Sequence, residues 1–243
     1  MSGVDMVVCV GKGGQRDLAE SISRRVKAPV SDKIGDGLTL LVDREGVSLV
    51  GFGLSLRGDF SEMLRRLSDG RLSHEMLVKI TKTSSENPLA VDATAGMGED
   101  SILLAAAGYE VVMFERDAVI AALLRDALQR ARRNPSLKEI VGRMRLIEGD
   151  SVELMSELAR RPELIYLDPM FPERKKSGLI NKKLQLIQKL ESPCSGEKEL
   201  LDAALAVKPA KIVIKRPLKG EPLAGRKPSY SVKGKAIRYD VIV

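Results

Sequence analysis

Short apolar runs alternate with amphipathic segments from Pro88 onward, and this pattern predicts strands that are each followed by a helix. Buried strands are expected at residues 89–92, 110–114, 144–147, 164–167 and 211–214. Helical spacing of apolar positions is expected at residues 101–107, 119–132, 152–160, 182–190 and 198–207. Such an alternation is typical of an open, mostly parallel sheet covered by helices. Residues 230–233 and 237–243 add a terminal β-hairpin.

The first 87 residues have a different pattern, with fewer and shorter repeats. They predict strands at residues 6–10, 38–42 and 47–50, a helix at 16–26, and a linking helix within 62–67 or 73–81. Asp43-Arg44-Glu45-Gly46 is a hairpin turn signal between the last two strands. We therefore expect an α/β protein in which residues 1–87 form a small N-terminal α/β domain with its linking helix, and residues 88–243 form a doubly wound, Rossmann-like domain.

Small and acidic residues follow the first two predicted strands of the larger domain. Ligands bind beyond the carboxyl ends of the strands in doubly wound sheets, so these positions belong together. Gly96 and Gly98 allow a ligand to approach the backbone before a helix begins at about Asp100. Glu115, with Arg116 beside it, ends the second strand and is placed to accept hydrogen bonds from both hydroxyls of a ribose.

The next two strands end in carboxylates as well. Asp150 is placed to accept a hydrogen bond from an adenine amino group, and Ser151 is expected to cap the following helix. Asp168 ends the fourth strand. The dinucleotide fingerprint G-x-G-x-x-G is incomplete, because Ser101 stands where its third glycine belongs. These features favour an adenosine ligand without a diphosphate, and S-adenosylmethionine is such a ligand.

The fourth strand leads into LDPMFP, a turn that two prolines stiffen and keep from becoming helical. Asp168 in this turn can accept hydrogen bonds from a planar exocyclic amine, while the ring of Phe171 stacks on the base that carries the amine. We therefore expect both residues to be catalytic. Two plainer interpretations stay open: a simple exit from strand to loop, and a core aromatic that anchors the turn.

The motifs VDATAGMGED, VMFERD, IYLDPMFPERKKS and VIKRP, in this order and spacing, resemble the small-subunit ribosomal RNA guanine-N2 methyltransferase family, RsmJ. The resemblance covers residues 88–243 and is loose before them. It implies a class I methyltransferase that uses S-adenosylmethionine to methylate a guanine N2 amine near the 3′ end of 16S ribosomal RNA. The cofactor contacts that it implies are Glu99, Asp100, Glu115, Arg116, Asp150, Ser151 and Asp168. The chain departs from the family at Glu99, where relatives usually carry arginine, so contact there is expected through backbone amides.

Positive charge is concentrated in two segments of a chain whose formal net charge is +7. Residues 173–189 and 208–243 together carry an excess of 13 positive charges, and the rest of the chain is acidic. This imbalance favours a phosphate-bearing partner, namely ribosomal RNA or the small ribosomal subunit, although solvated charge is the simpler alternative. The residues expected to contact phosphates are Arg174, Lys175, Lys176, Lys182, Lys183, Lys215, Arg216, Lys219, Arg226 and Lys227.

The remaining composition excludes other classes of site. One histidine, His74, and two distant cysteines argue against a metal site and against an imidazole-based triad. Without a run of 18 apolar residues or a signal-peptide layout, we expect a cytoplasmic protein that is not bound to a membrane. Two other functions stay open: a methyltransferase of the same fold that acts on other RNA, DNA or protein, and an RNA-binding protein without catalytic activity.

Overall fold

Two β-sheets organise the computed structural model of the chain, which describes residues 5–169, 186 and 196–243. The larger sheet has seven strands in the order β11-β12-β10-β9-β6-β7-β8. Its strands are β6 (Leu89–Asp92), β7 (Glu110–Glu115), β8 (Met144–Glu148), β9 (Leu164–Leu167), β10 (Lys211–Pro217), β11 (Tyr230–Lys233) and β12 (Ile237–Ile242).

Strand directions in this sheet confirm the doubly wound prediction. Strands β8, β7, β6, β9 and β10 are parallel neighbours, whereas β12 runs antiparallel to both β10 and β11. The last two strands therefore form the expected terminal hairpin. The chain passes from β6 to β7 on one side and returns to β9 on the other, so the loop after β6 lies at the point where the winding reverses.

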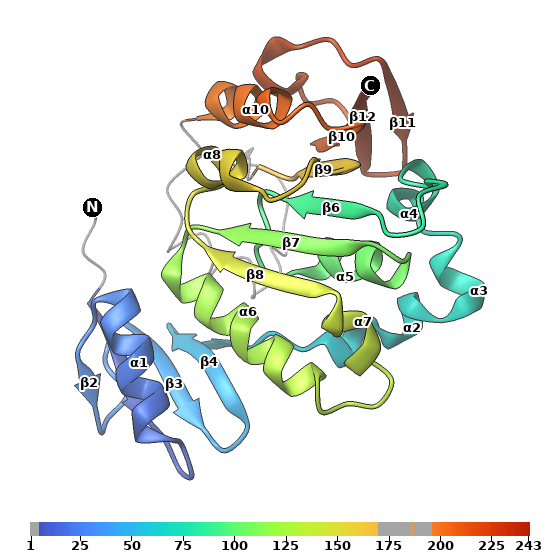
Figure 1. Cartoon of the computed structure of the whole chain (residues 1–243). Helices are drawn as coiled ribbons and strands as arrows, with labels where there is room; N and C mark the ends of the chain where they lie inside the picture. The colour runs from blue at the N-terminus through green and yellow to red at the C-terminus, as the bar shows by residue number, and fades with distance from the viewer. Residues whose placement is uncertain (1–4, 170–185, 187–195) are drawn as a thin grey trace.

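Helices cover both faces of the larger sheet (Figure 1). Successive side chains of a strand point to opposite faces, so Tyr166 packs in the core shared with helix α5, while Ile165 and Leu167 pack in the core shared with α10. Both faces are apolar, which explains why these strands read as continuous apolar runs. The main helices are α5 (Glu99–Ala106), α6 (Ala118–Ala131), α7 (Lys138–Gly142), α8 (Ser151–Leu154) and α10 (Glu197–Ala206).

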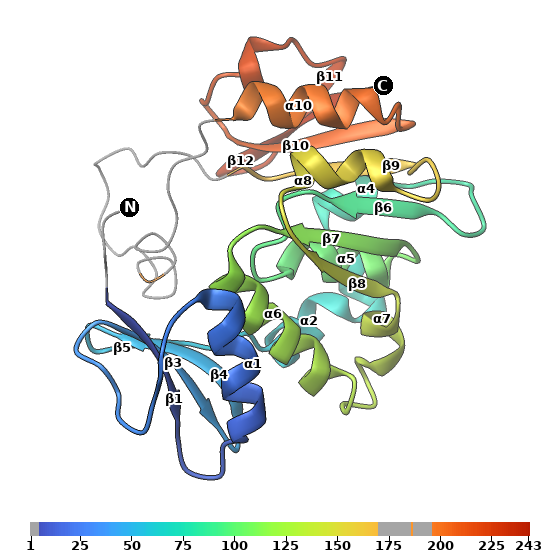
Figure 2. The same ribbon diagram turned by 60° about the vertical axis from the view of Figure 1, so that its left-hand side comes forward.

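The smaller sheet precedes the larger one in the chain and has the order β2-β1-β3-β4-β5. The predicted turn at residues 43–46 joins β3 and β4 as an antiparallel hairpin, with Asp43 paired to Gly46. Helix α1 packs on this sheet, which lies beside α6 in Figure 2. Its elements are β1 (Met6–Val10), α1 (Arg16–Val26), β2 (Val30–Ser31), β3 (Leu38–Asp43), β4 (Gly46–Gly51) and β5 (Leu54–Leu56).

Helix α6 belongs to the cores of both sheets. Val119, Ala122 and Leu123 pack with the small sheet, while Leu124 and Leu128 face the core of the large sheet. Burying a leucine side chain stabilises a fold by about 1.5 to 3 kcal/mol, so each of the two stripes on this helix contributes substantially. The two sheets are consequently joined by a shared helix rather than by a flexible linker.

The segment between the sheets forms short helices that pack on the large sheet. Phe60, Met63 and Leu77 are buried in the same core as α5. The division of the chain near Asn87 stays a prediction, and we propose that residues 60–80 belong with the larger unit. The helices of this segment are η1 (Phe60–Met63), α2 (Leu64–Leu67), α3 (Asp69–Leu72) and α4 (Met76–Ile80).

Two details differ from the pattern of apolar positions, and a third prediction is not covered by the described residues. The helix expected at residues 152–160 is shorter, because α8 ends at Leu154 and is followed by a 3-10 turn, η2 (Met155–Glu157). Helix α7 was not anticipated. The helix expected at residues 182–190 lies outside the described residues except for Leu186, which is buried in the core of the small sheet.

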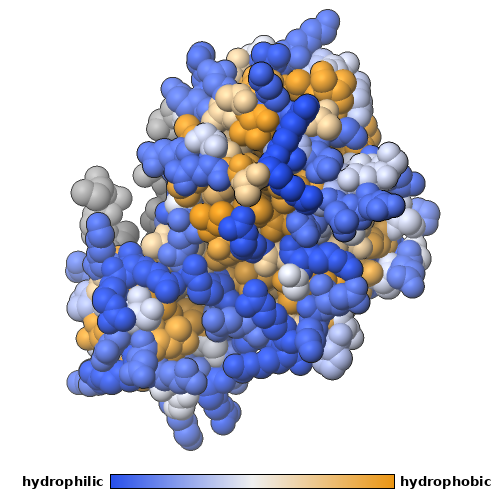
Figure 3. Space-filling model, viewed as in Figure 1, coloured by the Kyte–Doolittle hydropathy of each residue, from blue (hydrophilic) through white to orange (hydrophobic). Residues whose placement is uncertain are grey.

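Polar side chains cover most of the face seen in Figure 3, and hydrophobic ones appear mainly toward its middle and top. No helix in the part of the chain that the structure describes has both the length and the apolar character needed to cross a membrane.

Candidate functional site

The loops that follow β6, β7, β8 and β9 converge at one edge of the large sheet and are tied together by backbone donors. The Asp168 N–H donates to Oγ1 of Thr94 at 2.7 Å. The Gly96 N–H donates to Oε2 of Glu115 at 2.9 Å, and the Gly149 N–H donates to the Glu115 carbonyl at 2.9 Å. The structure thus brings together the strand ends that the sequence singled out.

Asp92 anchors the glycine-containing loop from inside the protein. Its side chain is buried, and its two carboxylate oxygens accept hydrogen bonds from the Thr94 N–H at 3.1 Å and the Ser101 hydroxyl at 2.5 Å. Burial disfavours the charged form and raises the pKa of Asp92 to about 7. Asp92 was not among the predicted contacts. It shapes the loop rather than facing a ligand.

Gly96 and Gly98 both have positive φ angles, +52° and +76°, which favour glycine. A Cβ atom on Gly98 would lie 2.9 Å from Cδ1 of Leu124 and 3.1 Å from Cζ of Phe60, so Gly98 lets helix α5 begin close to the core. A Cβ on Gly96 would meet no described atom within 4 Å. No described atom therefore occupies the space beside the Gly96 backbone, and its role in binding a cofactor stays a prediction.

Glu115 ends β7 and is held in a fixed orientation. Its Oε1 accepts a hydrogen bond from the Asp117 N–H at 2.8 Å, and its Oε2 accepts one from the Gly96 N–H. The residue is only 7% exposed. Carboxylate oxygens accept more than one hydrogen bond each, so this group can also receive the hydroxyls of a ribose. Arg116 is exposed beside it. Asp117, which the sequence reasoning missed, caps α6 through the N–H groups of Val119 and Ile120.

The end of β8 differs from the expectation in one respect. Asp150, not Ser151, caps α8, because Oδ1 of Asp150 accepts the Val152 N–H at 2.9 Å. Ser151 is the first residue of the helix and is buried. Aspartate is as good a cap as serine, and the pattern alone does not separate two adjacent candidates. Asp150 is half-buried at the carboxyl end of β8, and its contact with adenine stays a prediction.

Asp168 joins a cluster of charged groups at the ends of β9 and β10. The Lys215 ammonium lies 2.9 Å from Oδ2 of Asp168 and 2.8 Å from Oδ2 of Asp100, and the Tyr166 hydroxyl donates to the same Asp100 oxygen at 2.6 Å. In the register of the sheet Ile214 pairs with Leu167, so Lys215 lies alongside Asp168. Both residues point toward the α5 face, where Asp100 stands in the first turn.

The pKa values in this cluster reflect burial and mutual attraction. Burial raises the pKa of Asp168, although Lys215 acts in the opposite direction. Burial by itself lowers the pKa of Lys215, but Asp100 and Asp168 raise it well above its ordinary value. The lysine therefore stays cationic, as a counter-ion to two carboxylates.

Lys215 and Arg216, two of the residues expected to contact phosphates, both pair with carboxylates of the protein. Lys215 is engaged with Asp100 and Asp168, while Arg216 is 5% exposed and pairs with Glu197 at 3.1 Å. The signal that identifies Lys215 is present in the sequence as a lysine that directly follows the buried run IVI. Its partner is on a neighbouring strand, which the linear pattern does not show.

The roles of Glu99 and Phe171 stay predictions. Glu99 is exposed in the first turn of α5 and lines a small hollow with Met97 and Arg57. Phe171 lies outside the described residues, so its stacking role stays a prediction. Among the residues that the structure describes, no group of three or more His, Cys, Asp or Glu side chains is arranged to hold a metal ion.

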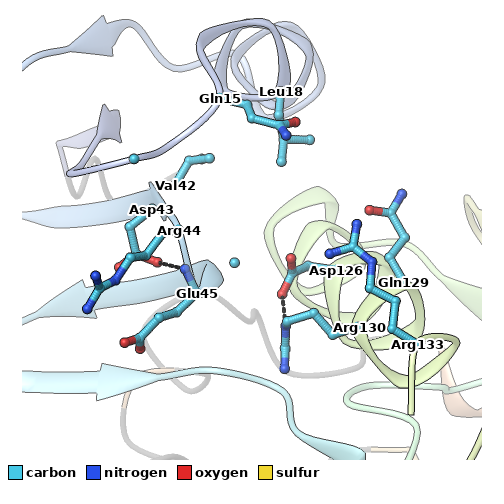
Figure 4. Close-up of a pocket in the computed structure, with 12 residues that line it drawn as sticks. Gln15, Leu18, Val42, Asp43, Arg44, Glu45, Asp126, Gln129, Arg130 and Arg133 are labelled. Carbon is cyan, nitrogen blue, oxygen red and sulfur yellow. Dashed lines mark hydrogen bonds and ion pairs between the residues drawn. The ribbon is translucent and has the colours of Figure 1, made fainter. Parts of the chain in front are cut away.

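A separate hollow of about 140 Å³ lies between the β3–β4 turn and the second half of α6 (Figure 4). Charged side chains line much of it. Among them, Arg130 bonds to Asp126 at 2.7 Å, while Glu45 bonds at 2.8 Å to Arg57, which lies outside the hollow. None of the residues at the ends of β6 to β9 lines it. We interpret it as the polar junction between the two sheets.

Comparison with known proteins agrees with this geometry. A family model for SAM-dependent methyltransferases, where SAM is S-adenosylmethionine, matches residues 36–243. Ribosomal RNA small subunit methyltransferase J of Thioalkalivibrio sulfidiphilus is 40% identical over 238 residues, which cover 94% of this chain and 93% of that protein. The protein of the same name from Pseudomonas aeruginosa strain PAO1 is 38% identical over 236 residues, with 93% and 90% covered.

The crystal structure of a SAM-dependent methyltransferase from Neisseria gonorrhoeae superposes with a TM-score of 0.76 at 30% sequence identity, covering 98% of this chain and 95% of that one. Likeness in sequence and fold thus extends over both sheets as well as the edge where the acidic strand ends meet. With a family model that matches residues 36–243, a relative that is 40% identical over most of both chains, and a seven-stranded doubly wound sheet, the chain belongs to the ribosomal RNA small subunit methyltransferase J family and is a SAM-dependent methyltransferase.

Proposed function

We propose that the protein transfers the methyl group of SAM to the exocyclic N2 amine of a guanine in 16S ribosomal RNA. The observation that carries this proposal is the placement of Asp168. Its backbone is tied to the glycine loop through Thr94, and its carboxylate lies at the same edge as Glu115. The names of the similar proteins from Thioalkalivibrio and Pseudomonas support ribosomal RNA as the substrate class.

The cofactor is held by groups whose chemistry matches its parts. Glu115 suits the ribose hydroxyls, Asp150 suits the adenine amino group, and the open side of Gly96 admits the ligand to the backbone. When bound, SAM supplies a methyl group on a positively charged sulfur, which a positioned nucleophile accepts without a metal ion. The negative charge of this edge of the sheet is complementary to that sulfonium.

The acceptor amine needs activation, because the lone pair of guanine N2 is delocalised into the ring. Asp168 accepts hydrogen bonds from the amine and so turns its lone pair out of conjugation. The Lys215 ammonium lies 2.9 Å from Oδ2 of Asp168, and we assign Oδ1 to the amine. The raised pKa of Asp168 suits it to hold the proton that the nitrogen releases. Holding the reactants in line contributes up to about 7 to 11 kcal/mol.

The surface around the site suits a polyanion. Lys219 follows β10, and Lys233 and Lys235 flank the β11–β12 turn, where the Leu218 N–H bonds to the Ala236 carbonyl at 3.2 Å. All three lysines are exposed at the same edge of the sheet as Asp168. Lysines in such positions hold phosphates and set affinity rather than sequence choice.

The test is transfer of labelled methyl from SAM to purified 16S ribosomal RNA and to 30S particles, followed by mapping of the modified base. DNA and a mixture of ribosomal proteins serve as competing acceptors. We expect label on the N2 of one guanine and none on DNA or protein. Label on another atom or another class of acceptor would refute the proposal, and comparison of RNA with 30S particles identifies the form of the substrate.

A further inference from the structure

We propose that Lys215 is a positioning residue for methyl transfer: its ammonium holds Oδ2 of Asp168 and thereby directs Oδ1 toward the acceptor amine. This inference rests on the proposed function for the identity of that amine. The ion pair itself is a property of the protein without substrate, because it is formed between β9 and β10.

The position of Lys215 follows from the architecture of the sheet. Val213 and Tyr166 pack in the core on the α5 face, so the residues two positions further along each strand, Lys215 and Asp168, project to that face at the carboxyl edge. The lysine side chain is 27% exposed and the Asp168 side chain 33%, so the pair is partly desolvated. A partly desolvated ion pair orients its members more firmly than a surface pair does.

The charge around Asp168 explains why a cation is needed there. Asp100 on α5 raises the pKa of Asp168 by repulsion, and Asp100 and Asp168 together raise that of Asp92 on β6. Tyr166 on β9 and Tyr239 on β12 are uncharged phenols at the same cluster. Lys215 is the cation in direct contact with Asp168 within the described part of the chain, and Arg216 acts at longer range while it bonds to Glu197.

Removing the ammonium leaves Asp100 and Asp168 facing each other without a counter-ion. Two neighbouring carboxylates then share a proton, and one of the two pKa values rises strongly. A protonated Asp168 is a weaker acceptor for the amine, and its carboxyl group is free to rotate. The lysine thus affects methyl transfer through both the charge and the orientation of Asp168.

The experiment compares Lys215→Met with Lys215→Arg, because methionine keeps the length of the side chain and arginine keeps its charge. We expect Lys215→Met to lower kcat at pH 7 by about tenfold and to move the acid limb of the pH profile upward by about one unit. The arginine variant should restore the position of that limb. The double variant Lys215→Met with Asp100→Asn should move it back toward the wild type, since only one carboxylate then remains.

Lys211→Met provides the matched control. Lys211 is on the same strand and donates to the Ile80 carbonyl at 2.7 Å, far from the carboxyl edge. Its replacement should lower thermal stability and leave the acid limb where it is. The inference is overturned if the acid limb of the pH profile does not move in Lys215→Met. It is also overturned if the limb moves equally in Lys211→Met, or if Lys215→Arg does not restore its position.

A measurement without substrate separates this inference from the proposed function. Carbon-13 NMR titration of the Asp168 carboxyl in the resting protein should show a higher pKa in Lys215→Met than in the wild type. If that rise is seen while guanine proves not to be the acceptor, only the proposed function fails. If guanine N2 is methylated while the pKa of Asp168 and the acid limb are both unchanged in the variant, only the role of Lys215 fails.

Discussion

Asp92 combines nearly complete burial with a carboxyl group that titrates close to neutral pH. Its pKa is about 7 in the folded protein against an ordinary value of 3.8, so the folded state binds the proton more tightly than the unfolded chain. The stabilising effect is complete below about pH 4 and is lost as the pH rises through 7. Three pKa units correspond to about 4 kcal/mol as an upper bound.

We therefore expect Asp92→Asn to flatten the dependence of unfolding free energy on pH between 5 and 8. Asparagine keeps the shape of the side chain and one acceptor oxygen but does not ionise. Urea unfolding at several pH values measures the slope, and Asp69→Asn, an exposed aspartate at the start of α3, is the control. An unaltered slope in Asp92→Asn contradicts the assignment.

Asp168→Ala should reduce methyl transfer by at least about a hundredfold in single-turnover assays, because it removes the acceptor that orients the amine. Retention of the fold is checked by circular dichroism, since the carboxylate is partly exposed and Lys215 keeps Asp100 as a partner. Asp202→Ala, which removes an exposed carboxylate of α10, should leave the rate unchanged. Full turnover by Asp168→Ala would contradict the mechanism.

At the scale of single residues, the sequence predicted which side chains end each strand. It did not predict which of them pair with residues on neighbouring strands. Asp168 and Glu115 follow apolar runs, and parallel strands bring such positions to one edge. Lys215 was assigned to phosphate binding with the other cations of its basic segment. Its actual partner, Asp168, is 47 positions earlier in the chain, so the pairing is not visible in the sequence. Long-range pairs of this kind depend on strand register, which one sequence does not specify.

Elements with several periods of pattern were predicted well. Helices α1 and α6 and the seven strands of the large sheet lie close to their expected bounds, because each has enough residues to show its period. Strand β2 has two residues and β5 has three, too few for any alternation. Helix α7 has five residues and follows a short connection that contains Pro135, so no helical period is visible there.

The β3–β4 turn fits against α6 through Gly46. Its φ angle is +120°, and a Cβ there would lie 2.6 Å from Oδ2 of Asp126 and 2.9 Å from Nε of Arg130. We expect Gly46→Ala to lower the free energy of unfolding by about 2 to 3 kcal/mol, because it adds backbone strain and displaces the ion pair. Chemical denaturation measures this decrease.

Gly53→Ala is the matched control for this prediction. Gly53 also has a positive φ angle, +70°, but a Cβ there meets nothing within 4 Å. Its substitution should cost only the backbone strain, about 1 kcal/mol. Equal decreases in the two variants mean that the packing of the turn against α6 contributes nothing.

At the scale of the whole molecule, the edge of the large sheet that holds the site carries exposed lysines. Replacing Lys219, Lys233 and Lys235 together by glutamine should weaken binding to 16S ribosomal RNA and reduce the salt slope by about 0.7 to 0.9 for each phosphate that is no longer neutralised. Affinity for SAM, measured by calorimetry, should stay the same. Filter binding at several salt concentrations gives the slope.

Lys138→Gln is the control for the charge effect. Lys138 is exposed on α7, which precedes β8 and so lies toward the opposite edge of the sheet. Its substitution changes net charge without touching the proposed binding edge, so its slope should equal that of the wild type. If the triple variant binds RNA with the same salt dependence as the wild type, the RNA binds elsewhere on the surface.

Asp117 caps the start of helix α6 and its N–H donates to the Glu115 side chain, while Val119, Ala122 and Leu123 of that helix pack in the core of the small sheet. A ligand that fixes the Glu115 side chain should therefore slow the opening of α6. Because the small sheet packs on α6, it should become more stable as well. At a hundredfold excess over its dissociation constant, a ligand adds about 2.7 kcal/mol to the folded state. Amide protons of β1 and β3, remote from the cofactor pocket, should accordingly exchange with deuterium more slowly once SAM is present.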